Sequence, residues 1–414
     1  MVVYMAQMTT ETSRMIGGLT SAPLLPFAIP VFFSIILVIR NPISFNNKRF
    51  WGIFIVFLIW SFLIIIEKSL FTRKELSYYF FLFYAIIIAY IHVQIFGKQM
   101  FSLYEDILVK LSCISLCLWL FSVMLPSEAA SLFKLFPESK IGNNFFYIFQ
   151  WVDQAKAPED YFSIVVRNAG CSWEPGRFSI MVVLAIYCNL SRKGLVFRGN
   201  KNLIVLLLTV GSTLSTTGYI STLFLLIVFY FNKISVKKFF LFLVLGIPLV
   251  GLLFSMEFMS EKIMNQLDLQ PKLIELEKEV EYYNESVEED EYIAALSRFE
   301  SMYFEWENIK HTPLLGYGRN TSNSYFAKEF SSNFELTGGL LKLIGQHGIF
   351  LGIFLYIVLW FSSIMISKEM LVKKKYALFF VFLFYSVSYT VFSVPIFTAI
   401  WLYSLFAKRP VLKN

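Results

Sequence analysis

The chain has 414 residues, of which 57% are hydrophobic and only 16% charged, and its mean hydropathy is +0.62. A water-soluble globular protein has no use for that much apolar surface, so the composition excludes a soluble enzyme or binding module. The net charge of +7 does not indicate nucleic acid binding, because the basic residues lie in short segments between apolar runs. We therefore expect an all-α polytopic membrane protein with no nucleic acid partner.

Long apolar runs predict the membrane spans. A helix that crosses the ~30 Å hydrocarbon layer needs about 20 mostly apolar residues, since its backbone polar groups must be satisfied within the segment. The sequence supplies about 11 such runs, with a range of roughly 10 to 12. In chain order the predicted spans cover residues 23–39, 50–66, 76–96, 107–125, 175–190, 202–216, 218–231, 239–256, 339–366, 376–390 and 391–407.

These spans divide the chain into five parts. They are N-terminal spans (1–125), a first loop (126–174), central spans (175–256), an acidic and partly helical loop (257–338) and C-terminal spans (339–414). Lysine and arginine are concentrated in alternate short connections, which are expected on the cytoplasmic side. Both long loops, and a polar turn predicted at 215–218, then lie on the outer side. The connection 67–75 is an exception, since it is basic although this orientation places it outside.

The second long loop is strongly acidic. Between Glu257 and Lys310 it holds 15 acidic and five basic residues. A solvated acidic surface explains this run, and a lid or a docking surface for a partner is the alternative. The cysteines and histidines have no ligand spacing, with His92, His311 and His347 far apart, so the sequence predicts no metal site.

Ionisable residues gather where the first long loop enters a span, at Arg167, Glu174 and Arg177. Pro175 suits the first turn of a helix, and Glu174 before it would lie at the positive end of the helix dipole. An interfacial anchor with a helix cap explains this pattern as well as a ligand site does. Both interpretations stay open on the motif alone.

A second polar cluster begins at Arg298. Glycine and proline breaks within 313–318 predict an ordered turn, which Arg319 follows. Glu335 then introduces a span that carries His347, a residue we expect to hydrogen-bond to a neighbouring helix. In the predicted orientation both clusters and the turn at 215–218 share one membrane face, and ionisable groups beside spans are costly and usually functional.

The pattern resembles the O-antigen polymerase and O-antigen ligase superfamily, the Wzy and WaaL proteins. Three features between residues 165 and 365 carry the resemblance. They are Arg167-x-x-Gly170-x-x-x-Glu174-Pro175-Gly176, the span turn at 209–218, and Arg298 followed by Pro313-Leu314-Leu315-Gly316-Tyr317-Gly318. The segment Asn323-Ser324-Tyr325-Phe326 is similar to the family motif His-Asn-x-Tyr-Leu. Ser322 replaces the histidine usual in ligases, and the turn lacks their Ser-Arg pair, which favours the polymerase branch.

The resemblance implies a GT-C-like glycosyltransferase in the bacterial inner membrane, with an active site that faces the periplasm. It would transfer a growing glycan from undecaprenyl diphosphate to a hydroxyl of a new undecaprenyl-diphosphate-linked repeat unit. The implied reaction is inverting and needs no metal ion or other cofactor. Membrane lipid and a chain-length regulator of the Wzz type are the implied partners. An O-antigen ligase and, in another class, a flippase for the same lipid-linked oligosaccharides are the alternatives.

Fixed arginines in a low-dielectric site can stabilise the charge that develops on a leaving diphosphate. A carboxylate within hydrogen-bond reach can take the proton of the attacking sugar hydroxyl, and we expect Glu174 or Glu335 to do so. The residues expected to bind diphosphate, through the bidentate contacts that guanidinium groups make, are Arg167, Arg298, Arg319 and Arg177. The residues expected to bind the substrate are Asn323, Tyr325 and Trp173.

Aromatic residues are concentrated in the first long loop. An interfacial helix with an aromatic belt is the expected structure, and stacking on sugar rings or prenyl chains is the alternative. The residues concerned are Phe145, Phe146, Tyr147, Phe149, Trp151 and Trp173.

Overall fold

The computed structural model describes most of the predicted spans and parts of both long loops. The described residues are 25–43, 45–68, 73–136, 138–139, 142–146, 148–152, 166–172, 174–231, 294–295, 298–318, 320–329, 334–335, 339–389, 392 and 394–407. This part of the chain is mostly helical, which confirms an all-α membrane protein as the fold class. The predicted span 239–256 lies outside the described residues.

Among the described residues, eleven helices overlap the predicted spans. They are α2 (Leu25–Arg40), α3 (Lys48–Glu67), α4 (Arg73–Phe96), α5 (Gln99–Met124), α7 (Pro175–Lys193), α8 (Lys201–Thr213), α9 (Thr216–Tyr230), α15 (Leu340–Glu369), α16 (Ala377–Ser388), α17 (Pro395–Trp401) and α18 (Tyr403–Phe406). Four described segments are long and apolar enough to cross a membrane, namely Lys48–Glu67, Tyr79–Phe96, Gln99–Met124 and Leu340–Glu369. The predicted span 391–407 forms two short helices, α17 and α18, and the total number of spans stays a prediction.

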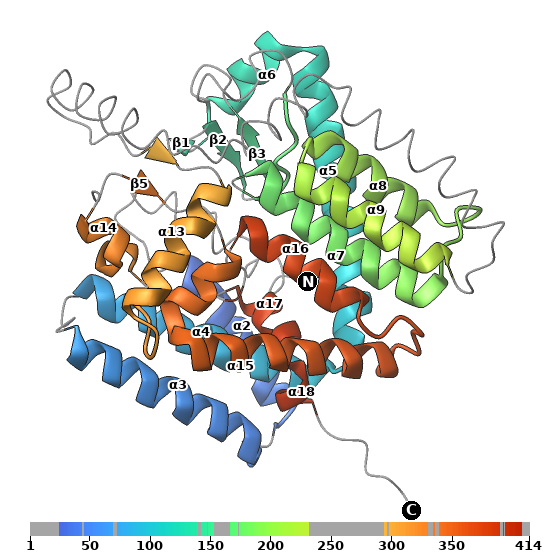
Figure 1. Ribbon diagram of the computed structural model, residues 1–414. Coiled ribbons are helices and arrows are strands. Elements are labelled where there is room, and N and C mark those ends of the chain that lie inside the picture. Colours follow the sequence, from blue (N-terminus) through green and yellow to red (C-terminus); the bar gives the residue numbers. More distant parts are fainter. Residues whose placement is uncertain are drawn as a thin grey trace, which may run out of the picture.

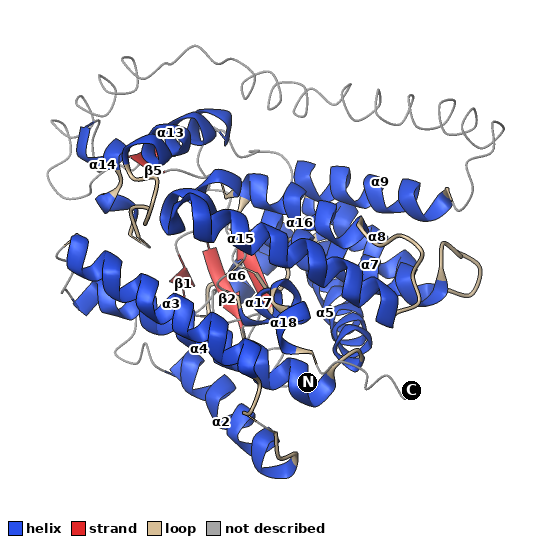
Figure 2. Ribbon diagram, turned by 60° about the horizontal axis from the view of Figure 1, so that its bottom comes forward, coloured by secondary structure: helices blue, strands red, loops and turns tan. Residues whose placement is uncertain are grey.

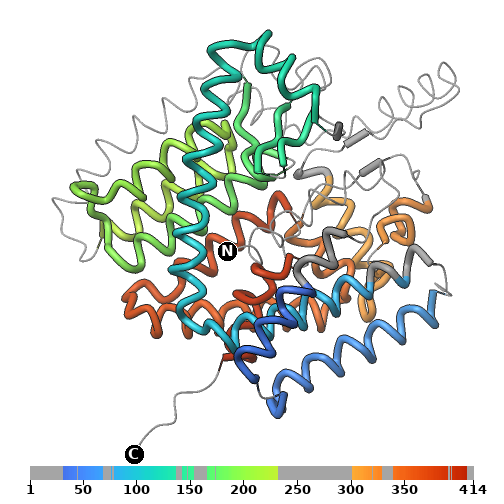
Figure 3. Tube along the Cα trace, turned by 180° about the vertical axis from the view of Figure 1, so that it is seen from behind, coloured from blue at the N-terminus to red at the C-terminus, as the bar shows by residue number. Residues whose placement is uncertain are grey.

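The helices pack in two neighbouring groups. Helices α7, α8 and α9 lie side by side on one flank, and α5 packs against α7 and α8 (Figure 1). Helices α15, α17 and α18 pack with α3 and α4 on the other flank, and α16 joins the groups by contacting both α9 and α15. Seen from behind, α5 runs from the end of α4 to the first long loop (Figure 3).

The first long loop contains a short helix and a small sheet. Helix α6 (Pro126–Phe133) precedes the antiparallel strands β1 (Glu138–Ser139), β2 (Gly142–Phe145) and β3 (Phe149–Val152). The prediction of an aromatic interfacial helix was therefore wrong for 142–152. Phe149 and Trp151 alternate with the buried Gln150 along β3, and both aromatic rings pack on Phe133 of α6. A strand period of two thus places the aromatic side chains in a local core.

Helices α8 and α9 meet at a tight turn, as predicted. The turn consists of Leu214, with a left-handed φ of 47°, and Ser215, whose hydroxyl accepts a hydrogen bond from the N–H of Gly218 at 3.3 Å. This serine caps the N-terminus of α9 and satisfies one of its unpaired backbone donors. The predicted pair of short helices is confirmed, with the turn at 214–215.

The helix ends gather at two opposite ends of the molecule. We call one of them the basic end. It carries Arg192 at the end of α7, Lys201 at the start of α8 and Lys374 in the connection from α15 to α16, and α9 also ends there. There the Arg192 guanidinium pairs with Glu105 at 2.8 Å, and Lys374 donates to the carbonyl oxygen of Phe231. At the site end, opposite, Thr217 of α9 bonds to Ser388 of α16 at 2.8 Å. Neighbouring helices therefore alternate in direction, as the loop charges predict.

The described part of the acidic loop packs on the site end. It comprises β4 (Ala294–Ala295), α13 (Arg298–His311), the 3-10 turn η1 (Thr321–Asn323), α14 (Tyr325–Glu329) and β5 (Phe334–Glu335). Helix α13 packs on α15, and α14 packs on α13. Figure 2 shows α13 and α14 on the side of the molecule away from α7, α8 and α9.

Helix α15 is broken at Gly348, whose φ of 79° and ψ of 164° are not helical. The loop after α13 supplies the missing backbone partners: the carbonyl oxygen of Pro313 accepts from the N–H of Ile349 at 2.8 Å. The N–H of Tyr317 donates to the carbonyl oxygen of Gly345 at 2.9 Å. A helix interruption at membrane depth is tolerated where neighbouring protein satisfies the backbone groups, and this loop does so.

Replacing Gly348 with alanine is expected to destabilise the protein. A Cβ at this position would lie 1.9 Å from the carbonyl oxygen of Leu314, and the positive φ disfavours any side chain. We expect the free energy of unfolding to fall by about 2–4 kcal/mol, which a lower unfolding temperature in detergent would show. Gly52→Ala in α3 is the matched control, because its Cβ would meet nothing within 4 Å and alanine favours a helix. Equal unfolding temperatures for the two variants would contradict the prediction.

Candidate functional site

The first motif forms the N-terminus of α7. Pro175 is the first helical residue and Glu174 holds the N-cap position, as the sequence predicted. The Glu174 carboxylate makes no capping hydrogen bond to the helix backbone and instead accepts a hydrogen bond from the hydroxyl of Tyr389. A carboxylate at an N-cap ordinarily bonds the N–H groups of the first turn. Glu174 is therefore turned toward a neighbouring segment.

Tyr389, which follows α16, contacts two of the three ionisable residues of this motif. Its hydroxyl binds Glu174, and its ring lies 5.4 Å from the Arg177 guanidinium carbon, within cation–π range. Gly176 makes this approach possible, since a Cβ there would lie 2.1 Å from the tyrosine oxygen. The sequence analysis missed Tyr389 because it lies 215 residues from Glu174 and at the end of an apolar span.

Arg167 holds the turn between α8 and α9. Its Nε donates to the carbonyl oxygen of Thr213 at 3.1 Å, and its Nη2 donates to that of Leu214 at 3.2 Å. These are the last carbonyls of α8, where a cation also interacts favourably with the helix dipole. The neighbouring Asn168 is buried and donates to the hydroxyl of Ser212 at 2.9 Å. The motif and the turn are thus one unit, and the guanidinium of Arg167 is engaged with backbone.

Three helix N-termini meet around Tyr389. The N-cap of α9, Ser215, accepts a hydrogen bond from Ser179 of α7 at 3.0 Å. Gly339, the N-cap of α15, packs so closely on Tyr389 that a Cβ there would lie 2.4 Å from the tyrosine carbonyl oxygen. Helices α7, α9 and α15 therefore begin within one region, together with Arg177. Helix N-termini carry partial positive charge and unpaired N–H groups, so this region favours an anion.

The second motif lies partly outside the described residues. Arg319 lies outside them, as does Trp173 of the first motif. Only the backbone of Arg298 and Glu335 is described. Arg298 opens α13, and β4 pairs with β5 in parallel, with Ala295 opposite Glu335. This pairing brings the backbone at Glu335 beside the residues that lead into Arg298.

The predicted substrate-binding residues on this side lie in η1 and α14. Asn323 ends η1, and its backbone N–H donates to the carbonyl oxygen of Asn320 at 3.2 Å. The ring of Tyr325 stacks on that of His311 in α13, with centroids 3.6 Å apart. In Figures 1 and 2 these elements lie beside α13, away from the N-terminus of α7. Contact of Asn323 and Tyr325 with the substrate stays a prediction.

A buried carboxylate fixes the Gly316-Tyr317-Gly318 turn. Glu305 of α13 is buried, and its Oε1 accepts from the Tyr317 hydroxyl at 2.9 Å. Asn308 donates to its Oε2 at 3.4 Å, and Gly345 of α15 leaves room for this oxygen. Burial raises the pKa of Glu305 from 4.5 to about 6, although the Lys342 ammonium favours the charged form. The sequence analysis did not single out this residue, which resembles the other glutamates of the acidic loop.

The titration of Glu305 predicts how stability depends on pH. Because its folded pKa is raised, its favourable contribution is complete below pH 4.5 and is lost as the pH rises through about 6. The rise of the pKa from 4.5 to about 6 corresponds to about 2 kcal/mol in the free energy of unfolding. Glu305→Gln removes this titration while keeping a hydrogen-bonding group. We expect the unfolding temperature of the variant, relative to wild type, to rise between pH 4.5 and pH 7, and a constant difference would contradict this assignment.

His347 of α15 lies behind the same turn. Its Nδ1 is 3.0 Å from the carbonyl oxygen of Leu343 in its own helix, and its ring stacks on Trp60 of α3 at 4.6 Å. Trp60 in turn donates to the carbonyl oxygen of Leu315 at 3.0 Å. The contact of this buried histidine with the neighbouring helix α3 is thus aromatic stacking, in a layer that supports the turn.

Within the described part of the chain, no three His, Cys, Asp or Glu side chains lie close enough together to hold a metal ion. No protein family model matches the chain, and no curated protein matches it. The functional assignment therefore depends on the motifs and on the geometry around Tyr389.

Proposed function

We propose that the protein is a polymerase of O-antigen or a related surface polysaccharide. It transfers the growing glycan from undecaprenyl diphosphate to a hydroxyl of a new undecaprenyl-diphosphate-linked repeat unit, with inversion. In this proposal it is a GT-C-like enzyme of the bacterial inner membrane, and its site end faces the periplasm. The observation that carries the proposal is the meeting of three helix N-termini and Arg177 beside the Glu174 carboxylate.

The positive groups suit a leaving diphosphate. Each helix N-terminus is equivalent to roughly half an elementary charge, and Arg177 adds a full one. Arg167 adds its charge at the turn between α8 and α9, through a guanidinium held by two carbonyls. We propose that Arg298 and Arg319 complete the diphosphate site. Such fixed positive groups stabilise the leaving group as its bond to the sugar breaks, because they need no reorganisation during the reaction.

The carboxylate beside this region suits the acceptor. In the proposed mechanism Glu174 takes the proton of the attacking hydroxyl while the new C–O bond forms on the face opposite the departing diphosphate. Tyr389 orients the carboxylate through its hydrogen bond. Glu335 is the alternative base, and Asn323, Tyr325 and Trp173 are the proposed contacts to the sugars. A chain-length regulator would be the protein partner.

Reconstitution tests the proposal against its rivals. The purified full-length protein is incubated in detergent with a lipid-diphosphate-linked repeat unit and a metal chelator, and the products are separated by size. A ladder of products that differ by one repeat unit is expected. Attachment of the glycan only to an added lipid A acceptor would favour a ligase. Transbilayer movement of the lipid in vesicles, without any ladder, would favour a flippase and overturn the proposal.

A further inference from the structure

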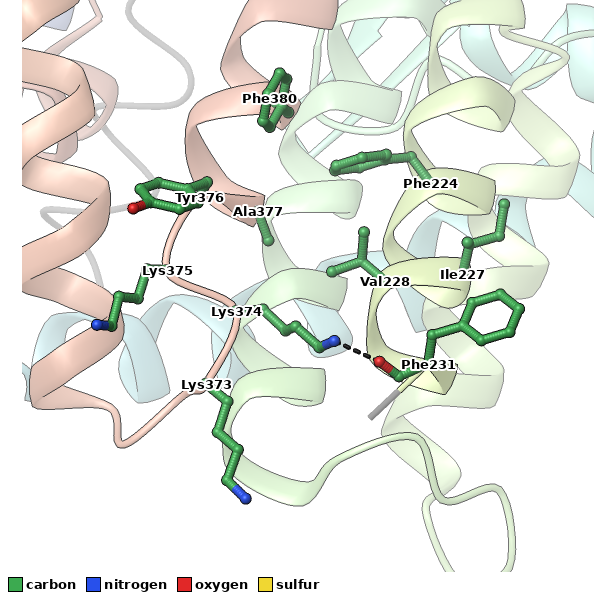
Figure 4. A pocket seen from close by; sticks show the side chains of 10 residues that line it. All are labelled: Phe224, Ile227, Val228, Phe231, Lys373, Lys374, Lys375, Tyr376, Ala377 and Phe380. Carbon is green, nitrogen blue, oxygen red and sulfur yellow. Dashed lines mark hydrogen bonds between the residues drawn. The ribbon is translucent and has the colours of Figure 1, made fainter. Parts of the chain in front are cut away.

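A pocket of about 660 Å³ lies at the basic end of the molecule, between the end of α9 and the start of α16 (Figure 4). Phe224 and Val228 of α9 line one wall, and Ala377 and Phe380 of α16 line the other. Lys373, Lys374 and Lys375, in the connection from α15 to α16, line its rim. Its volume is within the range of about 300–1,000 Å³ that is typical of ligand sites.

The pocket arises because α9 contacts α16 at one level and the connection before α16 at another, and the two helices separate between these contacts. Toward the site end, the ring of Phe224 lies 5.9 Å from that of Phe380 and 5.3 Å from that of Phe384. At the basic end, the Lys374 ammonium donates to the carbonyl oxygen of Phe231, the C-cap residue that follows α9. This bond satisfies a terminal carbonyl and holds the lysine loop against α9. The space between the two levels remains open.

The chemistry of the pocket is divided along its length. Its upper walls are apolar, whereas Figure 4 shows the ammonium group of Lys373 below the loop and that of Lys375 on the side of the loop away from α9. Both lysines are exposed, so their four-carbon stems can follow a ligand that enters from the rim. An apolar slot with cations at its mouth is complementary to an amphiphile with an anionic head.

We propose that this pocket binds an anionic glycerophospholipid of the cytoplasmic leaflet. An acyl chain occupies the slot between α9 and α16, and the headgroup phosphate binds Lys373 and Lys375. The orientation follows from the lysine-rich connections, which mark the basic end as cytoplasmic. The site belongs to the end of the molecule opposite Glu174 and Tyr389, so it is independent of the proposed glycosyl transfer. The bound lipid fastens α9 to α16, two helices that also support the turn at 214–215.

Photolabelling tests this site. The full-length protein is placed in phosphatidylcholine nanodiscs with graded amounts of phosphatidylglycerol, one of the two lipids carries a photoreactive acyl chain, and labelled peptides are mapped. We expect phosphatidylglycerol to label peptides that contain 224–231 and 376–380, and phosphatidylcholine to label them much less. Lys373→Gln combined with Lys375→Gln should weaken the phosphatidylglycerol affinity roughly 25-fold, from about fivefold for each lysine near an anionic headgroup.

Matched variants separate binding from folding. Lys98→Gln combined with Lys201→Gln removes the same charge from exposed lysines of the basic end outside the pocket, and should leave the labelling within about twofold. Arginine at both 373 and 375 should restore it, because the charge is kept. Equal labelling by the two lipids, or unchanged labelling of the glutamine variant, would overturn the proposal. So would the absence of labelling by either lipid.

Discussion

Glu174→Gln is expected to reduce polymer formation by the purified protein about 100-fold or more. Glutamine keeps the size of the side chain and a hydrogen-bond acceptor for Tyr389, but it cannot take a proton from the sugar hydroxyl. General-base catalysis contributes typically 10²–10⁴-fold to a rate. The measurement is the initial rate at which the lipid-linked repeat unit disappears, at a saturating concentration, with unchanged unfolding temperature as evidence of folding.

The chain offers a matched control for this variant. Glu369 of α15 also accepts a hydrogen bond from a tyrosine, Tyr403, at 2.5 Å, but this pair lies at the basic end. Glu369→Gln makes the same chemical change and should leave the rate within about twofold. Tyr389→Phe removes only the orienting hydroxyl, and we expect it to lower the rate about tenfold by misplacing the carboxylate. Full activity of Glu174→Gln would show that Glu174 is not the base, and Glu335 would then be the proposed base.

Arg192→Ala is expected to produce a large loss of stability. Glu105 of α5 is buried, and its carboxylate pairs with Arg192 at 2.8 Å and accepts from Asn189 of α7 at 2.7 Å. Removing one partner leaves a buried charge, which costs about 3–5 kcal/mol in a fully buried pair. The Arg192 side chain is 33% exposed, so we expect about 3 kcal/mol, toward the lower limit. Chemical unfolding of the protein in detergent micelles measures it.

Two further variants test the cause of this loss. Arg198→Ala, at an exposed position in the connection from α7 to α8, should change the free energy of unfolding by about 0.5 kcal/mol or less. Glu105→Gln combined with Arg192→Ala should recover part of the loss, because the buried group then carries no charge and still bonds to Asn189. If the double variant is no more stable than Arg192→Ala, the pairing with Glu105 is not the cause.

Features that depend on a continuous run of residues were predictable from the sequence. Helices α3 and α15 follow from apolar runs, because the cost of burying backbone in lipid makes an uninterrupted apolar run a strong signal. The start of α7 followed from Pro175, and the turn between α8 and α9 followed from a short polar run. These features depend on residues that are neighbours in the sequence, so the sequence alone can predict them.

Features that depend on contacts between distant segments were not predictable. Nothing near Tyr389 indicates that its hydroxyl binds Glu174, and nothing near Glu305 distinguishes it from other glutamates of the acidic loop. Gly348 is one of several span glycines, and only the loop at 313–318 makes it a break. The aromatic residues of 142–152 were assigned to a helix because hydrophobicity alone does not distinguish a short strand from a helix.

The site residues illustrate the same division. Glu174 and Arg177 meet at one helix N-terminus, as their spacing along the chain implied. Arg167 was predicted to bind diphosphate, which stays a prediction, and in the structure its guanidinium donates to the last carbonyls of α8. Its sequence neighbours could not show this, because the carbonyls lie 46 and 47 residues downstream. The cap that the sequence predicted at the start of α7 places Glu174 at the N-cap position, but its carboxylate makes no hydrogen bond to the helix backbone and binds Tyr389 instead.

The break in α15 constrains how the protein enters the membrane during synthesis. The first part of this helix obtains backbone hydrogen bonds from residues 313–318, which emerge from the ribosome before it. Those residues must already be available when α15 inserts, since an interrupted helix without them would expose unpaired backbone groups to lipid. Insertion of α15 is therefore coupled to the folding of residues 313–318 against it. The backbone hydrogen bonds at the break are completed only when this loop and α15 come together.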